Sequence, residues 1–175
     1  MDLAVTTVKG GQMFSKEMIH TLYGYHYWAN HRILDFAARV DPADYFADAG
    51  YSHGSLHGII FHILRTDYAW RNSCQTLKPA VEPLLPENFP DLPAIRSRWE
   101  GEEQAMLAFL SSLSPDEIEG AIQLTDRRGN VHQFELWRVL VHVVLHAMQH
   151  RSETAALLTQ YGHSPGDLDF IFYRG

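Results

Sequence analysis

Three histidines lie four residues apart in the segment LVHVVLHAMQHRSE, at His142, His146 and His150. Residues four apart lie on the same side of an α-helix, one turn from each other, so these imidazoles share one stripe. Two imidazoles at that separation can bind the same metal ion. The 11 histidines of the 175-residue chain would give roughly 0.7 such pairs by chance. The chain has three pairs, and two of them lie in register on this apolar segment.

A third ligand must come from another segment, because one helix face seldom surrounds an ion. His62 is the best candidate, since it lies in the middle of an apolar stripe in a second predicted helix. We therefore predict a metal site formed by His62, His146 and His150. His53 and His57, near the start of the same helix, could edge the pocket. The alternative for each residue is an ordinary core or surface histidine whose ring is satisfied by hydrogen bonds.

Composition excludes several other kinds of chemistry. Cys74 is the one cysteine, so there is no internal disulfide, and it has no neighbouring histidine or basic cluster to activate it. No ligand histidine is followed by glutamate as in the HExxH motif of zinc proteases. The net charge of −7 argues against nucleic acid as a partner. No apolar run approaches the roughly 20 residues that span a membrane, and no signal peptide is evident, so we expect a cytoplasmic protein.

Four long segments with helical periodicity must position the histidines, at about residues 15–40, 52–75, 91–113 and 134–161. Asp41-Pro42 ends the first segment and Gly162 ends the last. We predict an all-α fold, an up-down four-helix bundle with a long Pro-rich crossing between helices 2 and 3. A small β-hairpin at 121–134 precedes helix 4. Residues 1–175 form one domain, with an N-terminal tail at 1–14 and a C-terminal tail at 163–175.

Several of these segments carry a recognisable set of motifs. They are YHYWANHRIL (25–34), GSLHGIIFHILRTDYAW (54–70), LVHVVLHAMQHRSETAALL (140–158) and a late LDF (168–170). As a set they resemble the DinB/YfiT-like superfamily of metal-dependent helical bundles. The resemblance implies a three-histidine site for a divalent ion, zinc or nickel, in which His62 matches the ligand of the second helix. His146 and His150 match the pair of the fourth helix, and His142 matches a pocket-lining position.

The sequence departs from the commoner His-His-Arg-Gly-Gln ending of that pattern and reads QHRSE at 149–153. The ligand position is kept, but Glu153 stands where glutamine is more usual. Glu153 and Asp67 are the carboxylates that could orient ligand imidazoles. Asp67 lies five residues after His62, so it is better placed to serve a histidine of another helix or to lie at the surface.

Some relatives in this superfamily are thiol transferases or isomerases that use mycothiol, bacillithiol or glutathione. Three neutral imidazoles leave a coordination position open, as in catalytic metal sites. We therefore expect a metal-dependent S-transferase that activates a low-molecular-weight thiol as a metal-bound thiolate, with a small-molecule substrate held under the Pro-rich crossing. The resemblance also implies a homodimer, for which the aromatic-rich first helix offers a surface.

Three alternatives stay open at this point. The same ion could activate water, which would make the protein a hydrolase. The protein could instead be a metal-stabilised stress-response binding protein without turnover. An iron site of two histidines and one carboxylate, with Asp67 in place of His62, is a further alternative.

Overall fold

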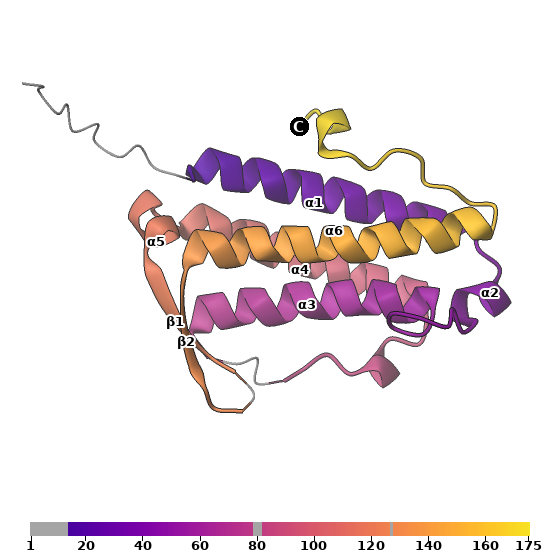
Figure 1. Cartoon of the computed structure of the whole chain (residues 1–175), viewed down its shortest axis with the longest axis horizontal. Coiled ribbons are helices and arrows are strands. Elements are labelled where there is room, and N and C mark those ends of the chain that lie inside the picture. Colours follow the sequence, from indigo (N-terminus) through magenta and orange to yellow (C-terminus); the bar gives the residue numbers. More distant parts are fainter. Residues whose placement is uncertain (1–13, 79–81, 127) are drawn as a thin grey trace, which may run out of the picture.

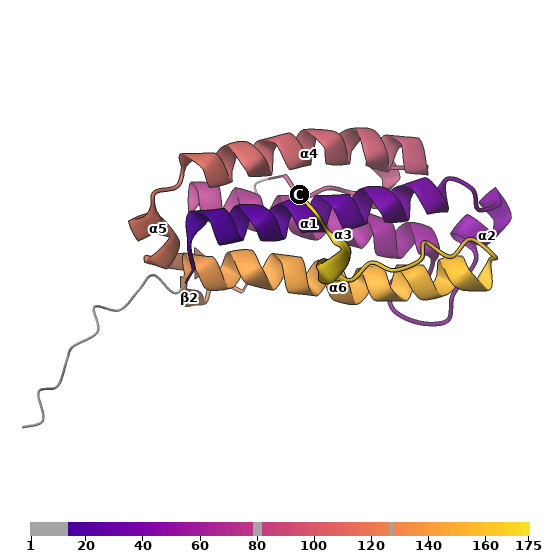
Figure 2. The same cartoon turned by 90° about the horizontal axis from the view of Figure 1, so that it is seen from above.

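In the computed structural model the described residues are 14–78, 82–126 and 128–175. Four long helices lie side by side along the molecule (Figure 1): α1 (Lys16–Ala37), α3 (Leu56–Thr76), α4 (Leu92–Ser112) and α6 (Leu136–Gln160). Both α1 and α3 pack against α4 and against α6 (Figure 2). The predicted helical fold is confirmed. Of the predicted N-terminal tail, residues 1–13 lie outside the described part of the chain.

The long helices begin and end at residues suited to those positions. Ser15, Ser55 and Asp91 each accept a hydrogen bond from a backbone N–H of the first turn, over 2.9–3.2 Å. Such a cap is typically worth about 1 kcal/mol of stability. Glu135 precedes α6 without a capping side chain, because the strand before it leads directly into the helix. Gly162, with φ of 78°, ends α6 as predicted.

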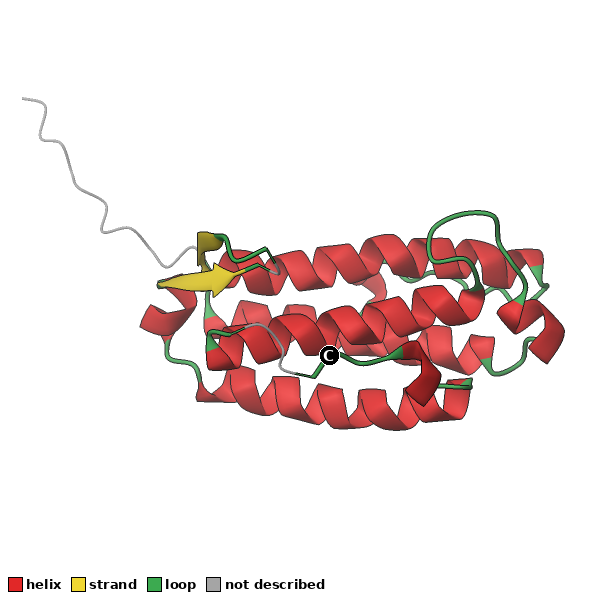
Figure 3. Ribbon diagram, turned by 90° about the horizontal axis from the view of Figure 1, so that it is seen from below, coloured by secondary structure: helices red, strands yellow, loops and turns green. Residues whose placement is uncertain are grey.

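Short elements connect the long helices. The sequence did not predict α2 (Pro42–Phe46), whose first turn is capped by the Asp41 side chain. The short helix α5 (Pro115–Glu119) begins after Ser114, where Ser114 and Glu117 form a capping box. The predicted hairpin is confirmed. Strand β1 (Ala121–Thr125) pairs antiparallel with β2 (Val131–Glu135), and Figure 3 shows it beside α5 at one end of the molecule.

The Pro-rich crossing joins α3 to α4 and contains the short 3₁₀ helix η1 (Pro86–Asn88). Residues 79–81 of this crossing lie outside the described part of the chain, as does residue 127 of the hairpin. The inner face of α4 carries Ile95, Trp99, Met106 and Leu110, which are all buried. These side chains, with those of the other three long helices, form the hydrophobic core.

The C-terminal segment, predicted as a tail, returns along α1 (Figure 1, yellow). It includes the 3₁₀ helix η2 (Phe170–Phe172). The Tyr25 hydroxyl donates to the Leu168 carbonyl over 2.9 Å, and the Phe170 ring meets Tyr25 edge-on at 5.2 Å. Gly24 leaves room for the Tyr173 hydroxyl, which a Cβ would overlap. Part of the aromatic surface of α1, which we considered for a dimer contact, is thus covered by the chain itself.

None of the helices in the described residues is both long and apolar enough to cross a lipid bilayer.

Candidate metal centre

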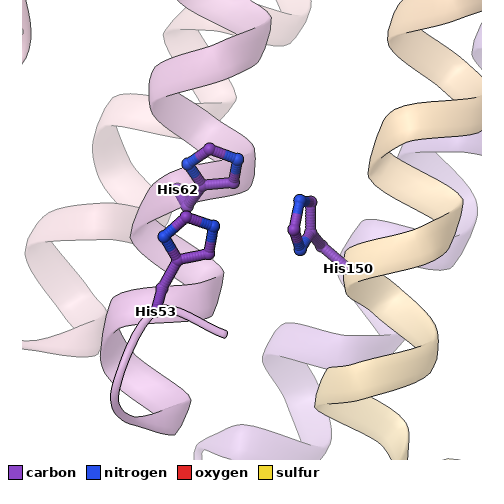
Figure 4. A group of neighbouring side chains, drawn as sticks. All are labelled: His53, His62 and His150. Carbon is purple, nitrogen blue, oxygen red and sulfur yellow. The ribbon is translucent and has the colours of Figure 1, made fainter. Parts of the chain in front are cut away.

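Four histidines from three parts of the chain gather between α3 and α6. His53 lies in the loop before α3, His62 on α3, and His146 and His150 on α6. In Figure 4 the ring of His150 faces the rings of His53 and His62 across the space between the two helices. Nitrogen atoms of these three residues lie within 4.8 Å of one another. A single ion could bring them together with small movements of the side chains, since zinc–imidazole bonds are about 2.0–2.1 Å long.

The three residues predicted from the sequence are neighbours in this cluster. Nε2 of His62 lies 3.1 Å from Nε2 of His146, and the His146 and His150 rings are 4.6 Å apart. His146 is not among the residues whose nitrogens share the 4.8 Å separation, where His53 stands instead. The ligand set His62, His146 and His150 therefore stays a prediction. His142 lies one turn further along α6, against the ring of Trp70.

Sequence reasoning placed His53 only at the edge of the site. Its ring stacks on that of His62, with 3.7 Å between centroids and 16° between planes. Nothing in the spacing of His53 reveals this contact, because a loop rather than a helix carries it there. In the sequence, Gly50 and Gly54 on either side of His53 indicate such a loop, because glycines permit the tight turns that it needs.

The electrostatics at His53, His62 and His146 favour neutral imidazoles, the form that binds metals. Burial lowers the pKa of His62 to about 3, with further contributions from His53, His150, His146 and the Arg65 guanidinium. Burial likewise lowers the pKa of His53 and of His146, and in both cases His150 adds to the effect. Histidines with lowered pKa values are unprotonated near neutral pH, so their lone pairs are available to an ion.

Glu153 serves as the predicted orienting carboxylate. Its Oε2 lies 2.8 Å from Nδ1 of His150, and it also accepts a hydrogen bond from the Ser52 hydroxyl over 2.5 Å. Burial raises the pKa of Glu153, but these two hydrogen bonds and the electrostatic effect of His150 and His53 together outweigh it, so the pKa is lowered. A carboxylate at this position favours the tautomer of His150 with its proton on Nδ1, in which Nε2 is the nitrogen that can bind a metal.

Asp67 belongs to a separate network in the core. Its Oδ2 accepts from Nε2 of His26 over 2.9 Å and from the Trp99 indole over 3.2 Å. On the other side of the His26 ring, Nδ1 accepts from the guanidinium of Arg151, which also donates to Asn30. Asp67 thus serves a histidine of another helix, His26 on α1, but this histidine lies outside the cluster, so the expectation that Asp67 orients a ligand imidazole is wrong. This geometry argues against the alternative iron site that would use Asp67 as a ligand.

A pocket of about 610 Å³ begins one helical turn from His62. Its walls come from α3, the Pro-rich crossing and the hairpin, and include Arg65, Tyr68, Trp70, Leu84, Leu85 and Phe134. Nη2 of Arg65 lies 3.3 Å from Nδ1 of His62, so this guanidinium connects the pocket to the histidine cluster. A smaller pocket of about 220 Å³ shares Trp70 and Phe134 with it and reaches His142.

Cys74 is buried, and burial raises its pKa to about 12. A thiol in that state is not a nucleophile at neutral pH. The prediction that Cys74 is not catalytic agrees with this environment.

Comparison with known proteins gives two findings. A family model described as "DinB family" matches residues 13–175. A curated protein from Bacillus subtilis (strain 168), named "Protein DinB", is 22% identical over 160 residues, which cover 87% of this chain and 91% of the relative. The match includes every histidine of the cluster.

Proposed function

Because the chain belongs to the DinB family, we propose that it is a divalent-metal-dependent enzyme whose ion is held by His62, His146 and His150. The observation that carries the proposal is the gathering of imidazoles from α3 and α6 around one space, with the pKa values of His62 and His146 lowered by burial. The finer description of the fold as an up-down four-helix bundle belongs to the same proposal, because such bundles place ligands on facing helices.

The side chains fit a divalent ion such as zinc or nickel. The donors are imidazoles, which suit both metals, and a carboxylate orients one of them from behind. A bound ion would supply a Lewis acid that lowers the pKa of a thiol or of a water molecule. None of the three proposed ligands is anionic, so the charge of the ion is not reduced by its ligands.

We further propose that the reaction is transfer of a low-molecular-weight thiol to an electrophilic small molecule. The pocket beside Arg65 supports this, since its aromatic and leucine walls can hold an apolar substrate within reach of the cluster. Arg65 takes part in none of the ion pairs found among the described residues, so the guanidinium N–H groups that do not contact His62 are available to a polar group of the substrate. Cys74 is inert, so the thiol of such a reaction would come from outside the chain.

A direct test is conjugation of a small thiol to chlorodinitrobenzene by zinc- or nickel-loaded protein. We expect turnover by the wild type, none by His146→Ala, and near-normal turnover by the control His163→Ala, whose histidine follows α6 and lies outside the cluster. Cleavage of an activated ester without thiol transfer would favour the hydrolase alternative. Metal binding without either activity would favour the non-catalytic alternative.

A further inference from the structure

The loop before α3 is tied to α6 next to the histidine cluster. Ser52 has φ of 54°, a left-handed conformation that side-chain-bearing residues seldom adopt, and Gly54 follows with φ of 83°. The backbone N–H of Ala49 donates to the Gly54 carbonyl over 2.6 Å and closes the loop. The Ser52 hydroxyl donates to the same Glu153 carboxylate that orients His150. One carboxylate thus fixes both the loop and a proposed ligand.

The loop places the His53 ring against the cluster on its solvent side. Its ring lies 3.7 Å from that of His62 and 5.1 Å from that of His150, between centroids. Gly58, in the first turn of α3, allows this approach, because a Cβ there would overlap the carbonyl oxygen of His53. The residue as a whole is exposed, although one face of its ring is covered by His62.

The nitrogens of His53 have no competing partner within residues 14–78, 82–126 and 128–175. Among the residues that the structure describes, none forms a hydrogen bond to this imidazole, whereas His62 and His150 both make such bonds. His53 has a nitrogen within 4.8 Å of nitrogens of two proposed ligands, His62 and His150. This position is that of a metal ligand rather than of a residue that only lines the pocket.

We propose that His53 is a fourth ligand of the ion. In that position it links the ion to the loop before α3 and covers the ion on its solvent side. The inference rests on the proposed function, because it concerns the ion held by His62, His146 and His150. Zinc usually takes four ligands in a tetrahedral arrangement, and His53 fills the position that the other three leave open. An external thiol must then compete with His53 for the ion, so this loop controls access to the site.

X-ray absorption at the zinc edge counts imidazole ligands directly and needs no turnover. We expect four imidazoles in the zinc-loaded wild type and three in His53→Ala. The control His57→Ala, whose histidine contacts Tyr45 instead of the cluster, should keep four. A count of three in the wild type would overturn the inference and leave the proposed function standing, whereas a wild type that binds no zinc would overturn both.

Two further measurements on the same variants separate a ligand from a neighbour. By competition with a chelator, His53→Ala should bind zinc at least about tenfold more weakly than the wild type, because even the loss of an orienting partner costs that much. In cobalt-loaded protein, azide should bind His53→Ala more tightly than the wild type, since a position has opened. Equal zinc affinity and equal azide affinity in the two proteins would contradict a ligand role for His53.

Discussion

Replacement of Glu153 by glutamine tests how the site holds its ligands. The carboxylate accepts hydrogen bonds from Nδ1 of His150 and from the Ser52 hydroxyl. Glutamine keeps the size and one carbonyl oxygen but removes the charge. Both hydrogen bonds then lose their charge assistance, which makes such bonds roughly twice as strong as neutral ones. His150 also becomes a weaker donor to the metal, because its Nδ1 proton is no longer held by an anion.

The size of the effect follows from these two contacts. Loss of an orienting partner typically lowers metal affinity by about 10–100-fold. We expect the zinc Kd of Glu153→Gln to rise within this range, which corresponds to about 1.4–2.7 kcal/mol of binding free energy. The upper part of this range is expected if the hydrogen bond from Ser52 to Glu153 also contributes to zinc affinity, since without it the loop that carries His53 is no longer bound to α6.

The assay is competition for zinc with a coloured chelator, supported by thermal unfolding with and without the metal. Ser152→Ala is the matched control, because the Ser152 hydroxyl only donates to the Met148 carbonyl one turn back on the exposed side of α6. The metal-free forms of both variants should unfold at temperatures close to that of the wild type. A zinc Kd of Glu153→Gln within about twofold of the wild type would refute the orienting role.

Three more predictions concern the core, the pH and the loop. Asp67→Ala leaves the Trp99 indole and the buried His26 without their acceptor, so the free energy of unfolding measured with urea should fall by about 3 kcal/mol. The control Asp35→Ala, at an exposed residue paired with Arg96, should lower the free energy of unfolding by less than about 1 kcal/mol. Equal losses in the two variants would contradict the role given to Asp67. The pKa of His62 is lowered from the ordinary 6.5 to about 3 in the folded protein. As the pH drops below 6.5, His62 therefore binds a proton in the unfolded chain before it does so in the folded one, and the stability of the metal-free protein should fall. Urea midpoints measured on either side of that pH would show this loss of stability, and His62→Gln should make the stability less dependent on pH. An unchanged pH dependence in His62→Gln would exclude His62 as its cause. Gly58→Ala should lower both the unfolding temperature and the zinc affinity, because the added Cβ overlaps the His53 carbonyl; helix propensity alone predicts the opposite sign for stability.

Much of the fold could be predicted because its signals are local. The stripe of α4 from Ile95 to Leu110 shows helical periodicity, and Ser55 and Asp91 mark helix starts through hydrogen bonds within one turn. The one-turn helix α2 was missed because five residues are too few for a periodic pattern. The packing of the C-terminal segment on α1 was missed as well, since its contacts, such as Tyr25 with Leu168, join residues far apart in the chain.

The same distinction applies to the site. His146 and His150 are recognisable because a helix fixes their separation, and His62 because it lies on an inward stripe. The position of His53 depends on a left-handed turn at Ser52 and on the hydrogen bond from the Ser52 hydroxyl to Glu153, about a hundred positions away. No spacing rule connects those residues. The role of Asp67 was partly foreseen from its angular position on α3, but its partner His26 could be found only in three dimensions.

Metal content after purification without an affinity tag tests the central claim most directly. Elemental analysis should find about one divalent ion per chain in the wild type, as expected for one such site. His62→Ala should have lost nearly all of it, while His163→Ala, outside the cluster, should retain it. A wild type that contains no metal, and takes up neither zinc nor nickel on dialysis, would contradict the account. Equal metal in the wild type and in His62→Ala would contradict the assignment of the site.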